Sequence, residues 1–187
     1  MRWVLWTVVV LIAAGGVVTL VGWLLPVAHE ASRSAHFNEH PDRVYDTVAD
    51  VAGYASWFEG VSRIEMLEPV SGRVRFREHT TSGPIVMEVE QALPPTRLVT
   101  RIADPEQPFG GTWTFDLTPE NGGTRMTITE RGEVYNPIFR FMARFVFGYT
   151  GTMEGYLRSL QKKLGAAGAA GAAGAASAAR ASDAEGP

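Results

Sequence analysis

One carboxylate in this sequence falls where an apolar side chain would be expected. The segment FGGTWTFDLTPENGGTRMTITERGEV contains Asn121 and Gly122, a pair that favours a tight turn between two antiparallel strands. This turn places Trp113 opposite Glu130, on the face that otherwise carries apolar residues. Burial there would raise the pKa of the Glu130 carboxyl, which makes it a candidate acid or base, or a hydrogen-bond anchor for a ligand. In the alternative, Glu130 lies at the strand end, where it meets water or pairs with an arginine.

A second group of residues consists of types that bind metals, but the geometry expected for them does not suit a metal site. His36, Glu39 and His40 occur in the order H-x-x-E-H, which one class of zinc proteases carries on a helix. Pro41 disfavours helical geometry at His40, and the residues before it are predicted to form a strand. The two imidazoles are therefore not expected to share a helical turn, and we predict no metal site and no cofactor.

Composition argues against several other kinds of chemistry. The 187 residues include no cysteine, which excludes disulfides and thiolate catalysis. The formal net charge is -3, so there is no basic excess to neutralise phosphates, and we expect no nucleic-acid partner. The sequence has no G-x-S-x-G, P-loop or dinucleotide-binding motif.

Three more polar residues, Glu78, Gln91 and Thr100, fall in the inward phase of other predicted strands. In RVRFREHT, Glu78 shares a face with Phe76, and in IVMEVEQAL, Gln91 shares a face with Met87. These residues are too few and too scattered to indicate a particular reaction. They could instead orient the one polar group of a ligand in an apolar pocket.

The opposite face of the same strands carries charges. With a turn centred on Ser82 and Gly83, Arg75 is expected opposite Glu90, and Arg101 of the following strand is expected beside Glu90. Exposed pairs of this kind contribute only about 0.2–1 kcal/mol each. We therefore interpret the row as a solvated face and not as a site.

The segment Trp3 to Leu25 has no charged residue and carries tryptophans near both ends. With a rise of about 1.5 Å per residue, a helix of this length crosses a hydrocarbon layer of about 30 Å. We predict a single-pass membrane anchor over residues 1–27, followed by a linker over residues 28–34. The alternative is a cleaved signal peptide, whose apolar region usually spans only about 7–15 residues. The distribution of basic residues favours an inside N-terminus, with the domain outside the cytoplasm.

The residues from Tyr135 to Leu164 are predicted to form one long helix. Ile138, Phe141 and Phe145 widen its apolar face in the first half, and this surplus is covered by other elements, lines a cavity or touches the nearby lipid. The continuous stripe expected to grip the sheet consists of Phe139, Met142, Val146, Tyr149, Met153, Tyr156 and Leu160.

Residues 165–187 are rich in alanine and glycine, with glycines at a period of three. Each glycine costs a helix about 1 kcal/mol, and nothing in this stretch can form a core. We predict a disordered tail.

Taken in order, the elements resemble a START-like or SRPBCC helix-grip domain, closest to the polyketide cyclase/dehydrase-like group. The resemblance rests on HPDRVYDTVADVAGYASWF, on GTWTFDLTPENGGTRMTITERGEV and on a final helix ending MEGYLRSLQKKL. It covers residues 35–164 and implies an α+β fold. In this fold, a curved antiparallel sheet surrounds a long C-terminal helix, two short helices follow the first strand, and a hydrophobic cavity lies between sheet and helix.

Proteins of this kind bind lipids, polyketides, hormones or other apolar molecules, and some catalyse cyclisation or dehydration. We therefore expect membrane-tethered binding of a lipid or another hydrophobic small molecule. The alternatives are a cyclase/dehydrase-like enzyme, with Glu130 as the only candidate catalytic residue, and an interaction domain without a ligand. The candidate ligand-binding residues are Phe76, Glu78, Met87, Gln91, Thr100, Trp113, Phe115, Ile128, Glu130, Phe139, Met142, Phe145 and Tyr149.

Overall fold

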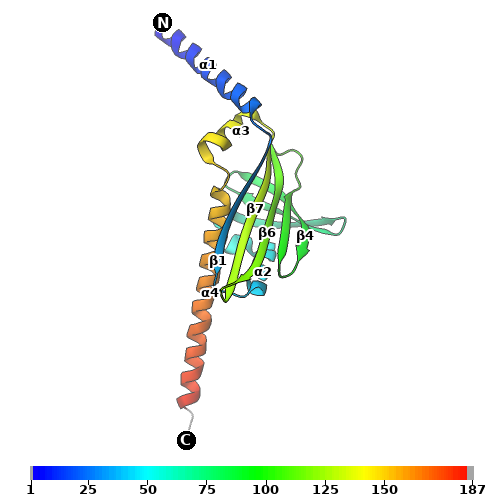
Figure 1. Cartoon of the computed structure of the whole chain (residues 1–187), viewed down its shortest axis with the longest axis vertical. Helices are drawn as coiled ribbons and strands as arrows, with labels where there is room; N and C mark the ends of the chain where they lie inside the picture. Colours follow the sequence, from blue (N-terminus) through cyan, green and yellow to red (C-terminus); the bar gives the residue numbers. More distant parts are fainter. Residues whose placement is uncertain (1, 185–187) are drawn as a thin grey trace.

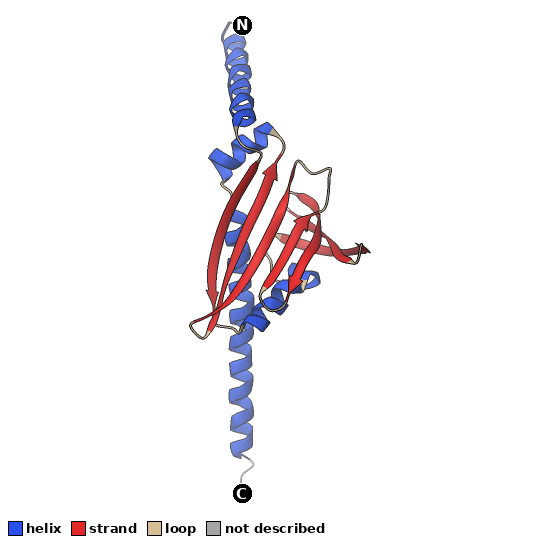
Figure 2. Ribbon diagram, turned by 45° about the vertical axis from the view of Figure 1, so that its right-hand side comes forward, coloured by secondary structure: helices blue, strands red, loops and turns tan. Residues whose placement is uncertain are grey.

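The computed structural model describes residues 2–184 and contains a seven-stranded antiparallel sheet in the order β1-β7-β6-β5-β4-β3-β2. The sheet curves around helix α4 (Figures 1 and 2). This is the α+β helix-grip architecture that the sequence predicts. The elements are α1 (Arg2–Leu24), β1 (Ala28–Phe37), α2 (Pro41–Ala49), the 3-10 helix η1 (Val51–Ser56), β2 (Val61–Val70), β3 (Arg73–Thr80), β4 (Gly83–Leu93), β5 (Arg97–Ile102), β6 (Phe109–Glu120), β7 (Gly123–Val134), α3 (Pro137–Met142), the π-helical turn η2 (Ala143–Phe147) and α4 (Gly151–Ala184).

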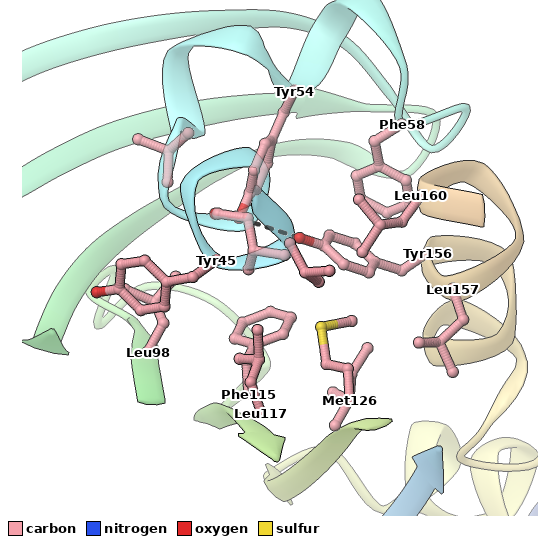
Figure 3. Close-up of a cluster of buried hydrophobic side chains, with 14 of the residues drawn as sticks. Tyr45, Tyr54, Phe58, Leu98, Phe115, Leu117, Met126, Tyr156, Leu157 and Leu160 are labelled. Carbon is pink, nitrogen blue, oxygen red and sulfur yellow. Dashed lines mark hydrogen bonds between the residues drawn. The ribbon is translucent and has the colours of Figure 1, made fainter. Parts of the chain in front are cut away.

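The hydrophobic core lies between the concave face of the sheet, the two short helices and the first part of α4. Figure 3 shows part of this core, in which side chains of α4 meet those of η1, β5, β6 and β7. Among the residues of α4 whose burial is described, the buried apolar ones are Met153, Tyr156, Leu157, Leu160 and Leu164. Their spacing of three and four residues puts them on one helical face, as an amphipathic helix on a core requires.

The two short helices follow β1 as the sequence predicts. Pro41 begins α2, where its fixed φ suits the first helical turn, and Val44 and Val48 are fully buried one turn apart. The Asp50 side chain accepts a hydrogen bond from the backbone N–H of Gly53 and so caps η1. These helices carry Tyr54 into the core.

Strand β1 begins at Ala28, so the prediction of a linker over residues 28–34 is wrong. The strand pairs with β7 along its whole length. Its inward positions include the small residues Ala31 and Ala35, which pack against the core without giving the strong apolar alternation of a typical strand. Only residues 25–27 separate α1 from the sheet, so the domain is held directly beside the end of α1.

The two hairpins differ in how well the sequence predicts their register. In the β6–β7 hairpin, Trp113 pairs with Glu130 as predicted. In the β3–β4 hairpin, Thr80 pairs with Gly83, so the turn is centred one residue earlier than expected. This shift moves the pairing by two residues, and Arg75 lies opposite Glu88 instead of Glu90.

Glu88 is therefore the centre of the charged row, and it is buried. One of its carboxylate oxygens accepts hydrogen bonds from Arg73 Nη1 at 2.9 Å and Arg101 Nη2 at 3.0 Å, and Arg75 Nε lies 3.8 Å from the other oxygen. Hydrogen bonding to Arg73 and Arg101 holds the pKa of Glu88 below its usual range. The prediction of a simple solvated row is wrong at this residue.

The predicted long helix is interrupted, because Gly148 has φ 72° and ψ 178°. This backbone conformation ends η2, and α4 begins only at Gly151. Glycine adopts it without the steric cost that a Cβ would impose. The residues before Gly148 therefore do not continue the helical stripe that grips the sheet, and the prediction of one helix from Tyr135 to Leu164 is wrong.

Helix α4 continues to Ala184, well past the sheet (Figure 1). The prediction of a disordered tail is not what the structure describes for residues 165–184, while residues 185–187 lie outside its description. Alanine has the highest helix propensity, and the packed turns before Leu164 supply a nucleus from which the helix extends.

Helix α1 is, within residues 2–184, the one helix long and apolar enough to cross a membrane. Its large apolar side chains are exposed on all sides, as expected for a helix surrounded by lipid and not by protein. A helix of this kind at the N-terminus is a membrane span or a signal sequence.

Candidate functional site

A cavity of about 580 Å³ lies between the concave face of the sheet and α4. This volume falls within the usual range of about 300–1,000 Å³ for small-molecule pockets. The cavity wall is mostly apolar and aromatic, with Glu78 and Glu130 among its polar groups. The large apolar and aromatic side chains that line it include Tyr54, Phe58, Phe76, Met87, Phe109, Trp113, Phe115 and Tyr156.

Tyr156 is the centre of the aromatic wall. Its ring centroid lies 5.0 Å from that of Phe58, 5.1 Å from Trp57 and 5.3 Å from Phe115. Its hydroxyl donates to the hydroxyl of Tyr54 at 3.3 Å, and Tyr54 donates in turn to the backbone carbonyl of residue 48 at 2.6 Å (Figure 3). Burial raises the pKa of both tyrosines, so they stay neutral and serve as hydrogen-bonding members of the wall.

Glu78 projects from β3 into the same cavity. Burial raises the pKa of its carboxyl to about 7. Within the described residues, no hydrogen bond to this carboxyl relieves that burial. Near neutral pH a large share of Glu78 is therefore protonated, and in that form it donates a hydrogen bond.

Glu130 lines the cavity from β7 and has a partner that the sequence did not reveal. His29 Nε2 lies 3.3 Å from Glu130 Oε1, and the His29 ring stacks on Tyr149 with centroids 3.9 Å apart. Burial raises the pKa of Glu130, whereas His29 and Trp113 act in the opposite direction. The alternative of a solvated carboxylate at the strand end, or one paired with an arginine, does not describe Glu130.

A glycine makes room for this pair. Gly132 lies opposite His29 in the β1–β7 ladder, in the inward phase of β7. A Cβ at residue 132 would lie 2.3 Å from His29 Cε1 and 3.0 Å from Glu130 Oε1. Only a residue without a side chain therefore allows both groups to occupy this position.

The structure brings most of the predicted sheet residues to the cavity. Ile128 instead lies fully buried in the core beside it. Tyr149 stacks on His29 and is not part of the cavity wall. The predicted residues that line the cavity are Phe76, Glu78, Met87, Thr100, Trp113, Phe115 and Glu130.

Gln91 is a wrong prediction, because an irregularity in β4 reverses its phase. Val89 pairs with Thr100, but the next paired residue is Gln91, which lies opposite Val99. The extra residue of this bulge turns Gln91 to the outer face, where it is exposed.

Phe139, Met142 and Phe145 are also outside the cavity wall. They belong to α3 and η2, which precede the break at Gly148. Helix α3 packs mainly beside α1, and η2 packs on α3. Phe139 and Phe145 are exposed. Their prediction as ligand-binding residues assumed a continuous helix, and the break removes that basis.

His29 is the functional candidate that sequence reasoning missed. The prediction placed it in a linker, where no contact could be assigned. Had β1 been recognised, the pairing of residues 28–37 with β7 would have put His29 in the same inward phase as Ala31, which pairs with Glu130. The signal was present in the sequence but depended on the start of one weak strand.

The comparisons with known proteins agree with this geometry. Residues 28–165 match the model of a family described as polyketide cyclase/dehydrase and lipid transport. No curated protein matches the chain.

Several solved structures share the fold. The protein TTHA0849 from Thermus thermophilus aligns with a TM-score of 0.61 and 24% identity over 74% of this chain and 99% of that one. A START superfamily protein from Mycobacterium smegmatis aligns at 0.57 with 14% identity over 73% and 97%. The di-domain aromatase/cyclase StfQ of the steffimycin biosynthetic pathway aligns at 0.60 with 16% identity over 73% of this chain, which spans 50% of StfQ.

The family match includes β1, the whole sheet and the part of α4 that covers the cavity. It is therefore the cavity-forming unit, without α1, that is similar to known proteins. The chain belongs to the polyketide cyclase/dehydrase and lipid transport family.

Proposed function

We propose that the domain binds an elongated apolar molecule with a neutral polar group, and that α1 keeps this binding at a membrane. The observation that carries the proposal is the apolar cavity with two poorly solvated carboxyl groups, Glu78 and Glu130. These groups come from β3 and β7, which three other strands separate in the sheet. A ligand that reaches from one to the other must be extended.

The protonation of Glu78 indicates the kind of polar group that fits. A cationic ligand group would favour the ionised carboxylate, whereas a raised pKa favours the neutral acid. The neutral acid donates a hydrogen bond to a carbonyl or hydroxyl oxygen. Lipids, sterol-like molecules and polyketides carry such oxygens on a large apolar body.

The role of α1 as a retained anchor is supported by its contacts with the domain. Gly22 packs on Pro137, and the backbone carbonyl of Leu25 accepts a hydrogen bond from Arg140 Nη1 at 2.8 Å. A cleaved signal peptide has no need of such contacts. Mass measurement of the chain from washed membranes tests this part: loss of the first two dozen or so residues would remove the anchor.

Gly155 offers the sharpest test of the cavity. It lies in α4 on the cavity wall, and the nearest atom to a Cβ built there is Arg158 Nη2 at 3.9 Å. In Gly155→Phe, the ring would enter space that the ligand needs, and we expect affinity for an apolar fluorescent probe to fall at least about tenfold, or 1.4 kcal/mol. Probe titration of the full-length chain measures this.

Gly165→Phe is the matched control, because no atom lies within 4 Å of a Cβ there and the position is outside the cavity wall. Organic extraction and mass spectrometry should recover the same bound molecule from wild type and Gly165→Phe, but not from Gly155→Phe. Equal recovery from all three would identify it as lipid carried along with α1. Unchanged probe affinity in a folded Gly155→Phe chain would overturn the binding proposal.

A second candidate function is cyclisation or dehydration of a polyketide-like substrate. The observation that favours it is the His29–Glu130 contact at the cavity wall, where a carboxyl with a raised pKa meets a group that can exchange a proton with it. Glu130 would give a proton to a departing hydroxyl or take one from carbon beside a carbonyl. His29 would position the carboxyl.

Glu130→Gln tests the enzymatic candidate. The amide keeps the shape but cannot transfer the proton, so turnover of a linear poly-β-ketone analogue should slow by about 100-fold or more. Glu90→Gln removes an exposed carboxylate from the outer face and should leave turnover unchanged. If both variants turn over at the wild-type rate, Glu130 is not the acid or base.

A further inference from the structure

The α3–η2 segment, residues 137–147, presents an apolar surface that the domain does not cover. Phe147 is 72% exposed, Phe145 59% and Val146 58%. Ile138 and Phe139 of the same segment are also about half exposed. Large contiguous apolar surfaces of this kind mark contact with protein or membrane.

The segment is attached to one end of α1. A Cβ on Gly22 would lie 1.9 Å from the carbonyl oxygen of Pro137, so the two backbones are in close contact. Arg140 is buried and donates to the carbonyl of Leu25 at 2.8 Å and to that of Tyr135 at 3.1 Å. The guanidinium thus satisfies a carbonyl that the end of α1 leaves without a helical partner.

These contacts fix the depth of the segment relative to a bilayer. If α1 crosses the hydrocarbon layer, its last turn lies at the boundary between acyl chains and headgroups, where tryptophans such as Trp23 are enriched. Because α3 touches residues 22 and 25, it lies at that same boundary. Figure 1 shows α3 crossing the end of α1 and not continuing it.

We infer that the α3–η2 segment is a second membrane contact, which lies in the interfacial layer with Phe145, Val146 and Phe147 among the acyl chains. The segment contacts the same lipid surface that α1 enters. The inference therefore rests on α1 being the membrane anchor of the proposed function. Arg144, exposed in the same turn, reaches the headgroup layer, where a basic side chain next to apolar ones is favourable.

This contact would place the cavity at the bilayer. Phe109 and Gly151 belong to the cavity wall. Phe109 pairs with Val134 at the end of β7, just before α3, and Gly151 follows η2 by a short turn. The interfacial segment and this part of the cavity wall are therefore at the same end of the domain, and an apolar ligand could pass between bilayer and cavity without crossing water.

The absence of cysteine makes the test direct, since a single introduced cysteine carries the only label. The full chain is reconstituted in phosphatidylcholine/phosphatidylglycerol vesicles as three variants: Phe147→Cys, Leu11→Cys in the middle of α1, and Val74→Cys on β3. Val74 is 43% exposed and serves as the matched apolar control. Each cysteine carries a polarity-sensitive fluorophore, and lipids with spin labels at defined depths act as quenchers.

Lipid labelled near the headgroup should quench the Phe147 probe by about half or more, because interfacial helices bury their apolar face about 5–10 Å deep. The Leu11 probe should be quenched by lipid labelled near the bilayer centre, and the Val74 probe by neither. A quenched Leu11 probe with an unquenched Phe147 probe would overturn the second contact and leave the anchor in place. An unquenched Leu11 probe would remove the anchor. A blue-shifted but unquenched Phe147 probe would show burial against another protein chain and would also overturn the inference.

Discussion

Replacing Tyr156 by alanine is expected to lower the free energy of unfolding by about 3–5 kcal/mol. The Tyr156 side chain is 1% exposed, and its ring contacts aromatic rings from η1 and β6 as well as the turn before β2. Its removal takes away contacts that join α4 to the short helices and to the sheet. Because the void would join the ligand cavity, solvent can enter part of it, which favours the lower end of this range. Urea denaturation followed by circular dichroism measures the change.

Tyr156→Phe is the control for this substitution. It keeps the ring and removes only the hydroxyl that donates to Tyr54 at 3.3 Å, so we expect a loss of about 1 kcal/mol. Tyr54 then retains its own hydrogen bond to the carbonyl of residue 48. If Tyr156→Ala cost no more than Tyr156→Phe, the ring would not join the three elements as described.

Local signals predicted the parts of the fold that depend on neighbouring residues. The turn at Asn121 and Gly122 set the β6–β7 register and thus the pairing of Trp113 with Glu130. Pro41 correctly marked the beginning of α2. In each case a residue with a restricted or unusual backbone preference fixed the geometry within a few positions.

The errors arose where one residue changed the phase of everything beyond it. A turn centred one residue earlier moved the partner of Arg75 from Glu90 to Glu88. A bulge reversed the face of Gln91, and Gly148 redirected the helix that contains Phe145. Such shifts depend on which packing buries more apolar surface in the whole fold, and hydrophobic periodicity within a segment does not report that.

The candidate site contains both residues that the sequence predicted and one that it did not. Glu130 was found because a carboxylate in an apolar row is conspicuous, whereas His29 was missed because its strand has small inward residues. Glu78 was identified by phase alone, and its burial without a partner became visible only in three dimensions. The two carboxyls therefore differ: Glu130 has His29 within hydrogen-bond distance, whereas Glu78 makes no hydrogen bond within the described residues.

The burial of the Glu78 carboxyl predicts a specific dependence of stability on pH. The pKa of Glu78 is about 7 in the folded domain, against an ordinary value of 4.5 in the unfolded chain. Its contribution to stability is therefore fully present below pH 4.5, declines as the pH rises, and is lost above pH 7. The change is at most about 3.5 kcal/mol, since the two pKa values differ by about 2.5 and each pKa unit corresponds to about 1.4 kcal/mol.

Glu78→Gln isolates this contribution from those of other groups, some of which act in the opposite direction, as Glu88 does. Urea denaturation of wild type and variant should give a difference in unfolding free energy that shifts by about 3 kcal/mol, in disfavour of the wild type, between pH 4.5 and pH 8. Glu90→Gln, on the exposed outer face, should show no such shift. A bound ligand that accepts a hydrogen bond from the neutral acid should raise the pH at which the change is complete. A difference between wild type and Glu78→Gln that stays constant with pH would show that the Glu78 carboxyl is solvated in the cavity, and it would remove the polar anchor assigned to the ligand.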